Sequence, residues 1–277
     1  MIDIKELADH CHSKLNDSAT QEYKDKLSQM PTSGFLNTLK TLLTCYDDHG
    51  FRQEYIDPNT GDLIKVDQYT MLTPELLSNI EYCIREVCKN NIPGDFIECG
   101  VWRGGACVYA KHVLNELGEN RKVYLADSFA GLPAPNTESY PDDDGDPHWG
   151  HSELAIPVAE VKRVFNLFNA LDENVYFIEG FFKDTLPTAK EDIGAISVLR
   201  LDADMYEGTI QALDNLYDKL SIGGYCIIDD WLGVPGCTQA VIDFREKHNI
   251  DDRMLYCQPM PSVTGMHPSS HFWQKTK

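Results

Sequence analysis

Short apolar segments alternate with helical patterns between residues 94 and 248, and this alternation limits the possible folds more than any other feature of the chain. The apolar segments lie at 94–101, 122–127, 174–180, 195–204 and 224–230. Helical periodicity occupies the stretches between them, at 105–117, 157–170, 206–220 and 237–248. Strands that alternate with helices form βαβ units with parallel strands and right-handed crossovers. We therefore predict an α/β fold, a Rossmann-like doubly wound sheet that is mostly parallel.

The two ends of the chain depart from this pattern. Residues 1–92 are helical in pattern, and we assign them to an N-terminal helical extension that caps the main domain, residues 93–277. The candidate helices are 3–15, 20–29, 34–46 and 74–90, the last with Thr73 as N-cap and Pro74 at its first position. Near the C-terminus, the segments RMLYCQ and HFWQKTK indicate two late strands, which we expect to form an antiparallel hairpin at the sheet edge.

Residues 131–156 fit neither a helix nor a strand. They are rich in Pro, Gly and Asp, and a loop of this length inside a compact domain is usually a lid or disordered. The acidic run DDDGD at 142–146 lacks the spacing of an EF-hand calcium loop, so we expect a solvated acidic lid. His148, Trp149 and His151 within this lid loop are candidate substrate contacts.

The charge of the chain excludes several classes of partner. It carries 44 acidic and 24 basic residues, for a net charge of −20. Such a field repels nucleic-acid phosphates and anionic membranes, so we expect neither as a partner. The start, MIDIKELADHCHSKL, is not a signal peptide, and no stretch approaches the roughly 18 apolar residues of a membrane span. We therefore expect a cytoplasmic protein whose nine cysteines, none in a C-x-x-C pair, are reduced thiols.

Four groups of candidate functional residues follow the predicted strands, where open α/β sheets bind ligands. The first is the turn ECGVWRGG at 98–105, in which Gly100 and Gly104 let the backbone approach a ligand closely. Its spacing is not the G-x-G-x-x-G of dinucleotide-binding folds. Glu98 would repel a pyrophosphate but accept hydrogen bonds from an ammonium group. A ligand with an amino acid moiety therefore fits better than NAD, and a tight βα turn without a ligand is the alternative.

The second group follows the next strand. Asp127 ends that strand about 20 residues after the glycines, where an acid commonly accepts hydrogen bonds from ribose hydroxyls. Ser128 extends the group, and the ring of Phe129 could stack on an adenine. Asp127 could instead be a helix N-cap. Two further segments are candidate walls of the same pocket: 180–187, which includes Asp184, and Tyr69-Thr70-Met71, ahead of the helix predicted at 74–90. The alternative for 180–187 is that it only caps a helix.

The third and fourth groups are pairs of acids. Asp202 and Asp204 end the fourth strand, and acids at positions i and i+2 of an extended segment point the same way. They would be costly to bury unless a cation neutralised them; the alternative is that they cap a helix near Tyr206. Asp229 and Asp230 end the next strand. Together, Asp202, Asp229 and Asp230 are hard oxygen ligands that suit Mg²⁺, Mn²⁺ or Ca²⁺.

The order of these segments resembles that of the macrocin O-methyltransferase family, of the TylF and MycF type. The similar strings are GDFIECGVWRGGA, LADSFAGLP, EGFFKDTLP, LRLDADMYEGTIQAL, GGYCIIDDW and AVIDFR, and the resemblance runs from about Tyr69 to Phe244. The resemblance implies a class I methyltransferase fold with sites for S-adenosylmethionine (SAM) and Mg²⁺. Residues 93–277 would then be the SAM-binding catalytic domain, with 131–156 as its lid loop. Members of this family methylate sugar hydroxyls on macrolides, aminocoumarins and related metabolites.

The resemblance also implies roles for the cofactor-binding candidates. Glu98 and Gly100 would lie near the methionine part of SAM, and Asp127 would bind its ribose. The remaining predicted cofactor contacts are Gly104, Ser128, Phe129, Tyr69, Thr70, Met71 and Asp184.

For the chemistry, the resemblance implies that Asp202, Asp229 and Asp230 are the metal ligands. Asp204 is the first candidate for the catalytic base, and metal-bound Asp202 is the second. More distantly similar catechol and caffeoyl-CoA methyltransferases place a lysine shortly after the first metal-binding Asp. Met205 and Tyr206 stand there in this chain, which argues against a lysine base.

We therefore predict a SAM-dependent, Mg²⁺-assisted O-methyltransferase that acts on a hydroxyl of a sugar or other small natural product, as a homodimer. The alternatives are a catechol-type or N-directed methyltransferase and a non-catalytic SAM-binding protein. An NAD-dependent oxidoreductase would need the G-x-G-x-x-G pattern that the turn at 98–105 lacks. A metal-dependent hydrolase would account for the acids but not for the glycine-rich turn or Asp127.

Overall fold

The computed structural model describes residues 18–44, 46–47, 50–51, 54–56, 63–65, 68–257, 260–262, 265–267 and 270–277. Side chains are described for 21–44, 68–257 and 270–277. The helix predicted at 3–15 lies outside the described residues.

A sheet of seven strands forms the centre of the molecule. The strands are β5 Asp95–Cys99, β6 Val123–Asp127, β7 Val175–Glu179, β8 Ile196–Leu201, β9 Leu220–Ile228, β10 Leu255–Tyr256 and β13 His271–Gln274. Their order is β10-β13-β9-β8-β5-β6-β7. The neighbours from β9 to β7 are parallel, whereas β13 is antiparallel to β9 and β10 is antiparallel to β13. The predicted fold class, with its antiparallel C-terminal edge, is therefore confirmed.

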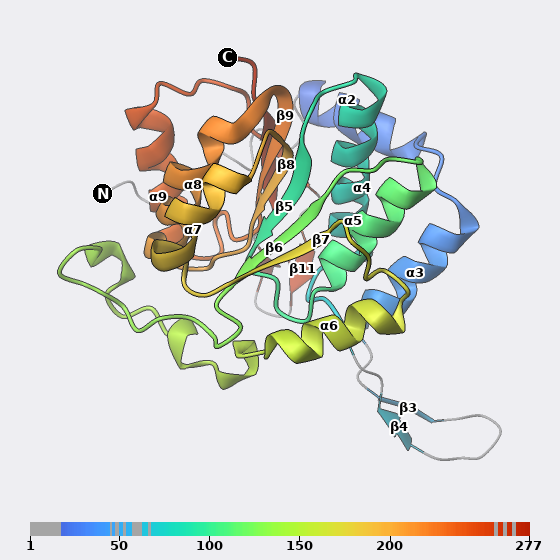
Figure 1. Cartoon of the computed structure of the whole chain (residues 1–277), viewed down its shortest axis with the longest axis horizontal. Coiled ribbons are helices and arrows are strands. Elements are labelled where there is room, and N and C mark those ends of the chain that lie inside the picture. Colours follow the sequence, from blue (N-terminus) through green and yellow to red (C-terminus); the bar gives the residue numbers. More distant parts are fainter. Residues whose placement is uncertain are drawn as a thin grey trace.

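Helices cover both faces of this sheet (Figure 1). On one side lie α2 Ser18–Ser28, α3 Gly34–Thr44, α4 Pro74–Lys89, α5 Gly105–Glu116 and α6 Val158–Leu167. On the other side lie α7 Phe182–Asp192, α8 Tyr206–Leu216 with the 3₁₀ turn η4 Tyr217–Lys219, and α9 Pro235–Lys247. As predicted, Thr73 is the N-cap of α4, where its side chain accepts from the Leu76 N–H, and Pro74 stands at the first helical position.

Alternate residues of the central strands supply two separate hydrophobic cores. In β5, Phe96 packs with α4 and α5, while Ile97 and Cys99 pack with the helices of the opposite face. All residues of β8 are buried, as expected for a strand covered on both sides. The chain that follows Leu201 therefore leaves the sheet between two helical layers, which brings Asp202 to a sheltered edge.

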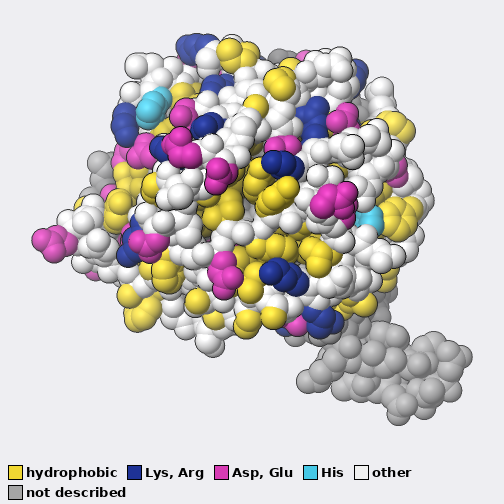
Figure 2. Space-filling view, in the orientation of Figure 1, with side chains coloured by type: hydrophobic (Ala, Val, Ile, Leu, Met, Phe, Trp, Pro, Cys, Tyr) yellow, Lys and Arg dark blue, Asp and Glu magenta, His cyan; other side chains and the backbone are white. Residues whose placement is uncertain are grey.

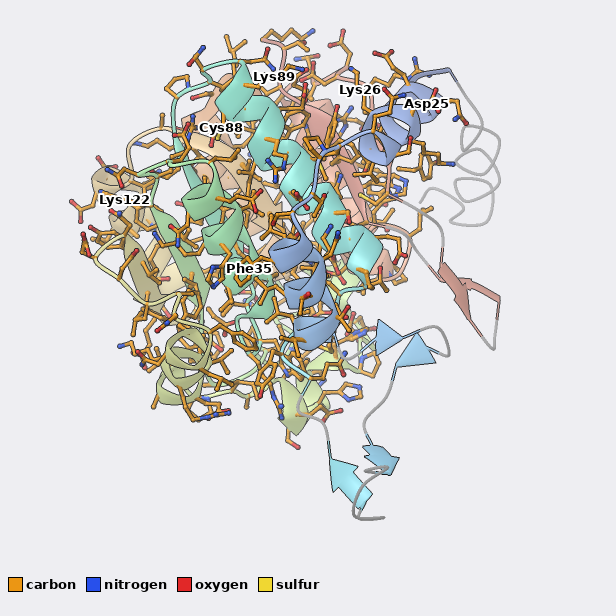
Figure 3. The ribbon with its side chains drawn as sticks, turned by 90° about the vertical axis from the view of Figure 1, so that its right-hand side faces the viewer. Asp25, Lys26, Phe35, Cys88, Lys89 and Lys122 are labelled. Atoms are coloured by element: carbon orange, nitrogen blue, oxygen red, sulfur yellow. The ribbon has the colours of Figure 1, made fainter. Side chains whose placement is uncertain are left out.

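The N-terminal segment differs in part from the helical pattern predicted for 1–92. The helix predicted at 34–46 ends at Thr44, and short antiparallel pairs follow it. These pairs are β1 Tyr46–Asp47 with β2 Gly50–Phe51, and β3 Glu54–Ile56 with β4 Leu63–Lys65; β11 Met260–Ser262 and β12 Gly265–His267 form another near the C-terminus. Figure 3 faces α3 and α4, where Phe35 of α3 lies with its ring centroid 5.2 Å from that of His112 on α5.

The lid loop at 131–156 carries 3₁₀ turns rather than longer elements: η1 Pro141–Asp143, η2 His148–Gly150 and η3 Ser152–Leu154. It runs along one edge of the molecule in Figure 1. The prediction of a solvated acidic lid is wrong for two of its acids, Asp143 and Asp146, and the side chain of Asp146 is only 8% exposed. Asp142 and Asp144 are exposed, but Asp143 is 0% exposed because its carboxylate accepts backbone hydrogen bonds from another part of the chain.

The acidic residues form no single block on the face drawn in Figure 2, where Asp and Glu side chains are spread among basic and hydrophobic ones. Within the described part of the chain, the helices are too short or too polar to cross a membrane. The seven cysteines described there are free thiols, in line with the prediction of reduced cysteines.

Candidate functional site

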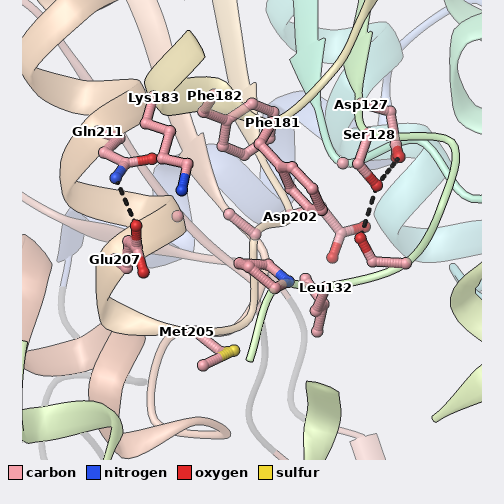
Figure 4. Close-up of a pocket in the computed structure, with 15 residues that line it drawn as sticks. Asp127, Ser128, Leu132, Phe181, Phe182, Lys183, Asp202, Met205, Glu207 and Gln211 are labelled. Atoms are coloured by element: carbon pink, nitrogen blue, oxygen red, sulfur yellow. Dashed lines mark hydrogen bonds between the residues drawn. The ribbon is translucent and has the colours of Figure 1, made fainter. Parts of the chain in front are cut away.

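A cavity opens at the carboxyl ends of β5, β6, β7 and β8. Its walls come from the segments that follow these strands and from the first turns of α8 (Figure 4). It is lined by Gly100, Asp127, Ser128, Gly131, Leu132, Pro133, Phe181, Phe182, Lys183, Asp202, Ala203, Met205, Glu207, Gly208 and Gln211. This is the edge of the sheet at which the sequence predicted ligand binding.

A second cavity adjoins the first. It is lined by Met71, Gly100, Val101, Trp102, Asp127, Gly131, Leu132, Leu154, Asp202 and Asp204. The two cavities share Gly100, Asp127, Gly131, Leu132 and Asp202. Asp127 and Asp202, from the ends of β6 and β8, therefore stand where the two cavities meet.

The glycine-rich turn brings the ends of β5 and β8 into close contact. Gly100 has φ +83°, and a Cβ placed there would lie 1.8 Å from the carbonyl oxygen of Asp202. Only glycine fits this approach of the two chains. Gly104, with φ +82°, is the N-cap of α5, and its Cβ would lie 2.7 Å from the side chain of Val161. Gly104 therefore packs closely against α6 and lines neither cavity.

Asp127 organises the same turn from the neighbouring strand. Its Oδ2 accepts from the Val101 N–H at 2.7 Å, and its Oδ1 accepts from the Phe129 N–H at 2.7 Å. Burial raises the pKa of Asp127, while these backbone donors oppose the rise. No helix begins at this point, so the alternative that Asp127 is a helix N-cap is wrong. Ser128 beside it lines the first cavity, and its Oγ donates to the Gly131 carbonyl (Figure 4).

Two predicted cofactor contacts face away from the cavities. Phe129 is buried in the hydrophobic core, with its ring centroid 6.2 Å from that of Phe177, because its backbone has φ +53° and turns the side chain inward. The stacking role predicted for it does not fit this position. The aromatic rings that do line the first cavity are Phe181 and Phe182, from the segment after β7 that the sequence marked as a candidate wall. Asp184 in that segment is exposed and lines neither cavity.

Glu98 also lies elsewhere than predicted. It is 1% exposed, and both carboxylate oxygens have partners inside the protein: Arg200 at Oε1 and the Cys107 thiol, which donates to Oε2 at 2.7 Å. Burial raises the pKa of Glu98 to about 7, against the lowering effect of the Arg200 charge. The carboxylate is thus an internal partner of the turn, and a direct contact with a ligand ammonium group does not fit this geometry.

Arg200, which the sequence patterns did not indicate, contacts three acids at this edge of the sheet. Its guanidinium is 1% exposed, and Nη1 donates to Asp202 Oδ2 at 2.9 Å. The same guanidinium pairs with Glu98 through Nη1 and with Asp229 through Nη2. The available signal was an arginine inside the otherwise apolar strand ISVLRL, since a fully buried charge requires a partner.

Three acids converge as predicted. One carboxylate oxygen from each of Asp202, Asp229 and Asp230 lies within 4.8 Å of the other two. Burial raises the pKa of Asp229 to about 6 and that of Asp230 well above its usual range, and the neighbouring carboxylates add to both shifts. Arg200 offsets part of this repulsion at Asp229. A divalent cation would offset the rest, so the donor set fits a hard metal ion.

Asp204 faces the same cavity as Asp202 but by a different geometry from the one predicted. The strand ends at Leu201, and Asp204 has φ +54°, so the pair is not part of one extended segment. The Asp204 N–H donates to Asp230 Oδ2 at 3.0 Å, which turns its carboxylate toward the second cavity. Burial and the Asp202 charge raise the pKa of Asp204 to about 7, while His148 of the lid loop lowers it.

The alternative role predicted for Asp202 and Asp204, capping of the helix near Tyr206, is wrong. The N-cap of α8 is Met205, which makes no side-chain capping bond. The backbone N–H groups of Tyr206 and Glu207 donate instead to Asp143 of the lid loop. Asp202 and Asp204 are therefore left to face the cavities.

The segment ahead of α4 contributes one side chain to the site. Met71 lines the second cavity, whereas Thr70 is buried and its Oγ1 accepts from the Leu72 N–H. Tyr69 contacts the glycine-rich turn through its carbonyl, which accepts from the Gly105 N–H at 2.9 Å.

The chain is similar to known methyltransferases in sequence. Residues 24–260 match the model of the family described as Macrocin-O-methyltransferase (TylF). Demethyldecarbamoylnovobiocin O-methyltransferase of Streptomyces niveus is 42% identical over 210 residues, which cover 75% of this chain and 79% of the relative. Mycinamicin III 3''-O-methyltransferase of Micromonospora griseorubida is 38% identical over 191 residues, which cover 68% and 74%.

The fold is shared with solved structures. The O-methyltransferase NovP matches with a TM-score of 0.74 and 36% identity, over 88% of this chain and 98% of that one. The calicheamicin methyltransferase CalS11 matches with a TM-score of 0.59 at 18% identity, over 92% of this chain and 90% of that one, a likeness of fold.

Proposed function

Because the chain belongs to the macrocin O-methyltransferase (TylF) family, and is therefore a SAM-dependent O-methyltransferase, we propose that it uses Mg²⁺ to methylate a sugar hydroxyl of a small natural product. The names of its relatives support the acceptor class. One is a mycinamicin III 3''-O-methyltransferase, and another, from Streptomyces olivaceus, is a 4'-O-methyltransferase of a rhamnosyl-tetracenomycin, 39% identical over 75% of this chain and 76% of the relative.

One observation carries the proposal of a metal: the convergence of Asp202, Asp229 and Asp230 within 4.8 Å at the edge of the two cavities. Burial raises the pKa of Asp229 and Asp230, and the charges of the neighbouring carboxylates raise both further. These three acids would hold the cation. When bound, it would supply Lewis acidity that lowers the pKa of a hydroxyl next to it.

For SAM, we propose that the adenine lies in the first cavity and the methionine part in the second. Asp127 lines both cavities, as a ribose-binding acid should, since the ribose joins the two parts. Ser128, Phe181 and Phe182 supply the walls for the adenine. Met71 and the backbone of Gly100 supply walls for the methionine part.

The proton of the acceptor hydroxyl has to leave before or during methyl transfer. We propose that Asp204 accepts it, because its carboxylate lines the cavity that also contains Asp202. A bond then forms between the acceptor oxygen and the methyl carbon, while the bond from that carbon to the sulfonium breaks and its electron pair returns to sulfur. The roles of the chain's own residues are to orient the reacting groups and to exclude water.

The domain assignment belongs to the same proposal. Residues 93–277 form the catalytic domain with the lid loop at 131–156, and residues 1–92 form an N-terminal cap. A homodimer and a cytoplasmic location stay predictions. In the described part, α3 and α4 share the core that covers β5, which supports a cap that is packed onto the catalytic domain.

The test is methyl transfer from isotope-labelled SAM, with the purified chain, to a panel of acceptors. The panel contains aminocoumarin and macrolide glycosides with free sugar hydroxyls, a simple catechol and an amine. We expect labelled product with at least one glycoside, loss of turnover on treatment with EDTA, and recovery with Mg²⁺. Turnover that persists in EDTA would reject the metal. Methylation of only the catechol or the amine would reject the acceptor class, and SAM binding without any product would favour a non-catalytic binding protein.

A further inference from the structure

We propose that Asp143, in the lid loop, is a positioning residue for methyl transfer, because it holds the first turn of α8 and with it the backbone that carries Asp204. This inference rests on the proposed role of Asp204 as the base. It adds a residue from the lid, distant in sequence, to the machinery that sets the geometry of the site.

The contacts of Asp143 bridge two distant parts of the chain. Its Oδ1 accepts from the Tyr206 N–H at 2.6 Å, and its Oδ2 accepts from the Glu207 N–H at 3.0 Å. The residue is 0% exposed, although its neighbours Asp142 and Asp144 are exposed. A buried carboxylate is unfavourable unless hydrogen bonds compensate it, and these two backbone donors do so.

The first turn of α8 has no cap of its own. The first N–H groups of an α-helix have no partner inside the helix, and a side chain at the N-cap usually accepts one of them. Met205 occupies that position and makes no such bond. Asp143 replaces the missing cap with two acceptors and a negative charge, which the helix dipole also favours at this end.

The first turn of α9 packs closely against the Asp143 carboxylate. A Cβ at Gly236, in the first turn of α9, would lie 2.9 Å from Asp143 Oδ1 and 2.9 Å from the Tyr206 nitrogen. The carboxylate therefore fills a narrow space between the first turns of α8 and α9. Its position is determined by two helices and is not that of a loose loop residue.

The backbone between β8 and α8 is thereby held at both ends. On one side, the Asp204 N–H donates to Asp230 Oδ2 at 3.0 Å. On the other side, two residues further along, the Tyr206 N–H donates to Asp143. Asp204 itself has φ +54°, in the left-handed region, which is less favourable for a residue with a side chain than for glycine. Release of the Asp143 contact would remove one of the hydrogen bonds that hold the backbone next to Asp204.

The lid loop that carries Asp143 is also part of the cavity walls. Gly131 and Leu132 line both cavities, and Leu154 lines the second. Near its other end, the carbonyl of Glu153 accepts from Trp102 Nε1 at 2.9 Å, which joins the lid to the glycine-rich turn. Asp143 thus couples the placement of the lid to the placement of the base.

The experiment compares the wild-type chain with Asp143→Ala, Asp143→Asn and the neighbouring control Asp144→Ala. Amide hydrogen exchange at Tyr206 and Glu207 is measured without acceptor, together with SAM affinity, thermal stability and kcat at saturating acceptor. For Asp143→Ala we expect those two amides to exchange roughly tenfold faster, as loss of an N-cap predicts. We expect kcat to fall about 10- to 100-fold, as for a misplaced catalytic group, and the SAM Kd to rise by a smaller factor, about fivefold at most, because Glu207 of the same turn lines the first cavity.

Asp143→Asn keeps the size and one acceptor oxygen, so we expect it to protect one of the two amides and to recover part of the lost kcat. If Asp143→Ala does not fold, this variant decides the question. Asp144→Ala should match the wild-type chain, because Asp144 is exposed on the same turn.

Unchanged exchange at Tyr206 and Glu207 in a folded Asp143→Ala variant would overturn the capping contact. Faster exchange with a wild-type kcat would overturn the positioning role, as would a loss of kcat that follows only the fraction of unfolded protein. The exchange measurement needs neither metal nor acceptor, and kcat is taken with whichever acceptor the wild-type chain methylates. A failure of the proposed sugar acceptor or of the metal is therefore distinguishable from a failure of this inference.

Discussion

Arg200 Nη1 lies 2.9 Å from Asp202 Oδ2, directly behind the carboxylates that face the cavities. The same guanidinium contacts Glu98 and Asp229, so a single buried cation faces three acids. An arginine fork has several donors in fixed directions, and it can hold one oxygen of an acid while leaving the other free. Arg200 therefore orients the acid cluster from inside the protein.

Removal of this buried cation should destabilise the protein strongly. We expect Arg200→Met to lower the free energy of unfolding by about 3–5 kcal/mol, because the buried Glu98 and half-buried Asp229 would lose their partner. The measurement is urea denaturation at neutral pH. The control is Arg163→Met, which removes an exposed pair with Glu160 and should cost less than about 1 kcal/mol. A similar small loss in both variants would contradict the role of Arg200.

Asp202 should be needed for turnover but not for SAM binding. We expect Asp202→Ala to lower kcat below detection in the presence of Mg²⁺, because it removes one of three converging ligands. SAM affinity, measured by calorimetry, should stay within a few-fold. Asp192→Ala, at the exposed end of α7, is the matched control. Normal turnover by the Asp202 variant would remove Asp202 from the metal site and from the chemistry.

The activity should depend on the ionisation of Asp204. A base acts in its deprotonated form, and burial with the Asp202 charge raises the pKa of Asp204 to about 7. Activity should therefore fall as the pH is lowered, and the midpoint should lie at about 7 or lower, since a bound cation would lower that pKa. The measurement is kcat/KM against pH. Asp204→Asn should lower kcat by roughly 10²- to 10⁴-fold. If Asp204→Asn kept the wild-type kcat and the same loss of kcat/KM at low pH, Asp204 would not be the base.

Gly100 should tolerate no side chain. It combines φ +83° with an approach of 1.8 Å between an added Cβ and the Asp202 carbonyl oxygen. Gly118 has φ +70° with open space around it, so Gly118→Ala isolates the conformational cost, which we expect to be about 1 kcal/mol. Gly100→Ala should cost roughly 3 kcal/mol or more and weaken SAM binding, since β5 and β8 must separate. If Gly100→Ala and Gly118→Ala lost equal stability in thermal and urea denaturation, the close approach of Gly100 to the Asp202 carbonyl would be unimportant.

Local sequence patterns predicted the scaffold of the site well, for a physical reason. The strand period and the helix period are visible in short windows, and strands that alternate with helices become parallel with their carboxyl ends at one edge. This was enough to bring Asp127, Asp202, Asp229 and Asp230 to the same edge. Phe181 and Phe182, in a segment marked only as a candidate wall, proved to line the first cavity.

Local patterns did not predict the direction of side chains where the backbone turns after a strand. Phe129 and Asp204 have φ +53° and +54°, and neither value follows from residue type. Phe129 consequently turns into the core, and Asp204 leaves the extended line that its spacing from Asp202 implied. Glu98 is part of a strand whose neighbours decide what its carboxylate meets, and those neighbours are Arg200 and Cys107.

The sequence by itself determined the α/β order, the mostly parallel sheet and the set of acids at its edge, because these depend on periodicities within a few residues of each position. Only the tertiary structure decided that Arg200 lies behind those acids and that Asp143 caps a helix more than 60 residues further along the chain. The contacts of Arg200 with Glu98 and Asp229, and that of Asp143 with the Tyr206 N–H, join groups 29 to 102 residues apart, and no local pattern predicts them. They form because buried charges and unpaired N–H groups must find partners once the layers have packed.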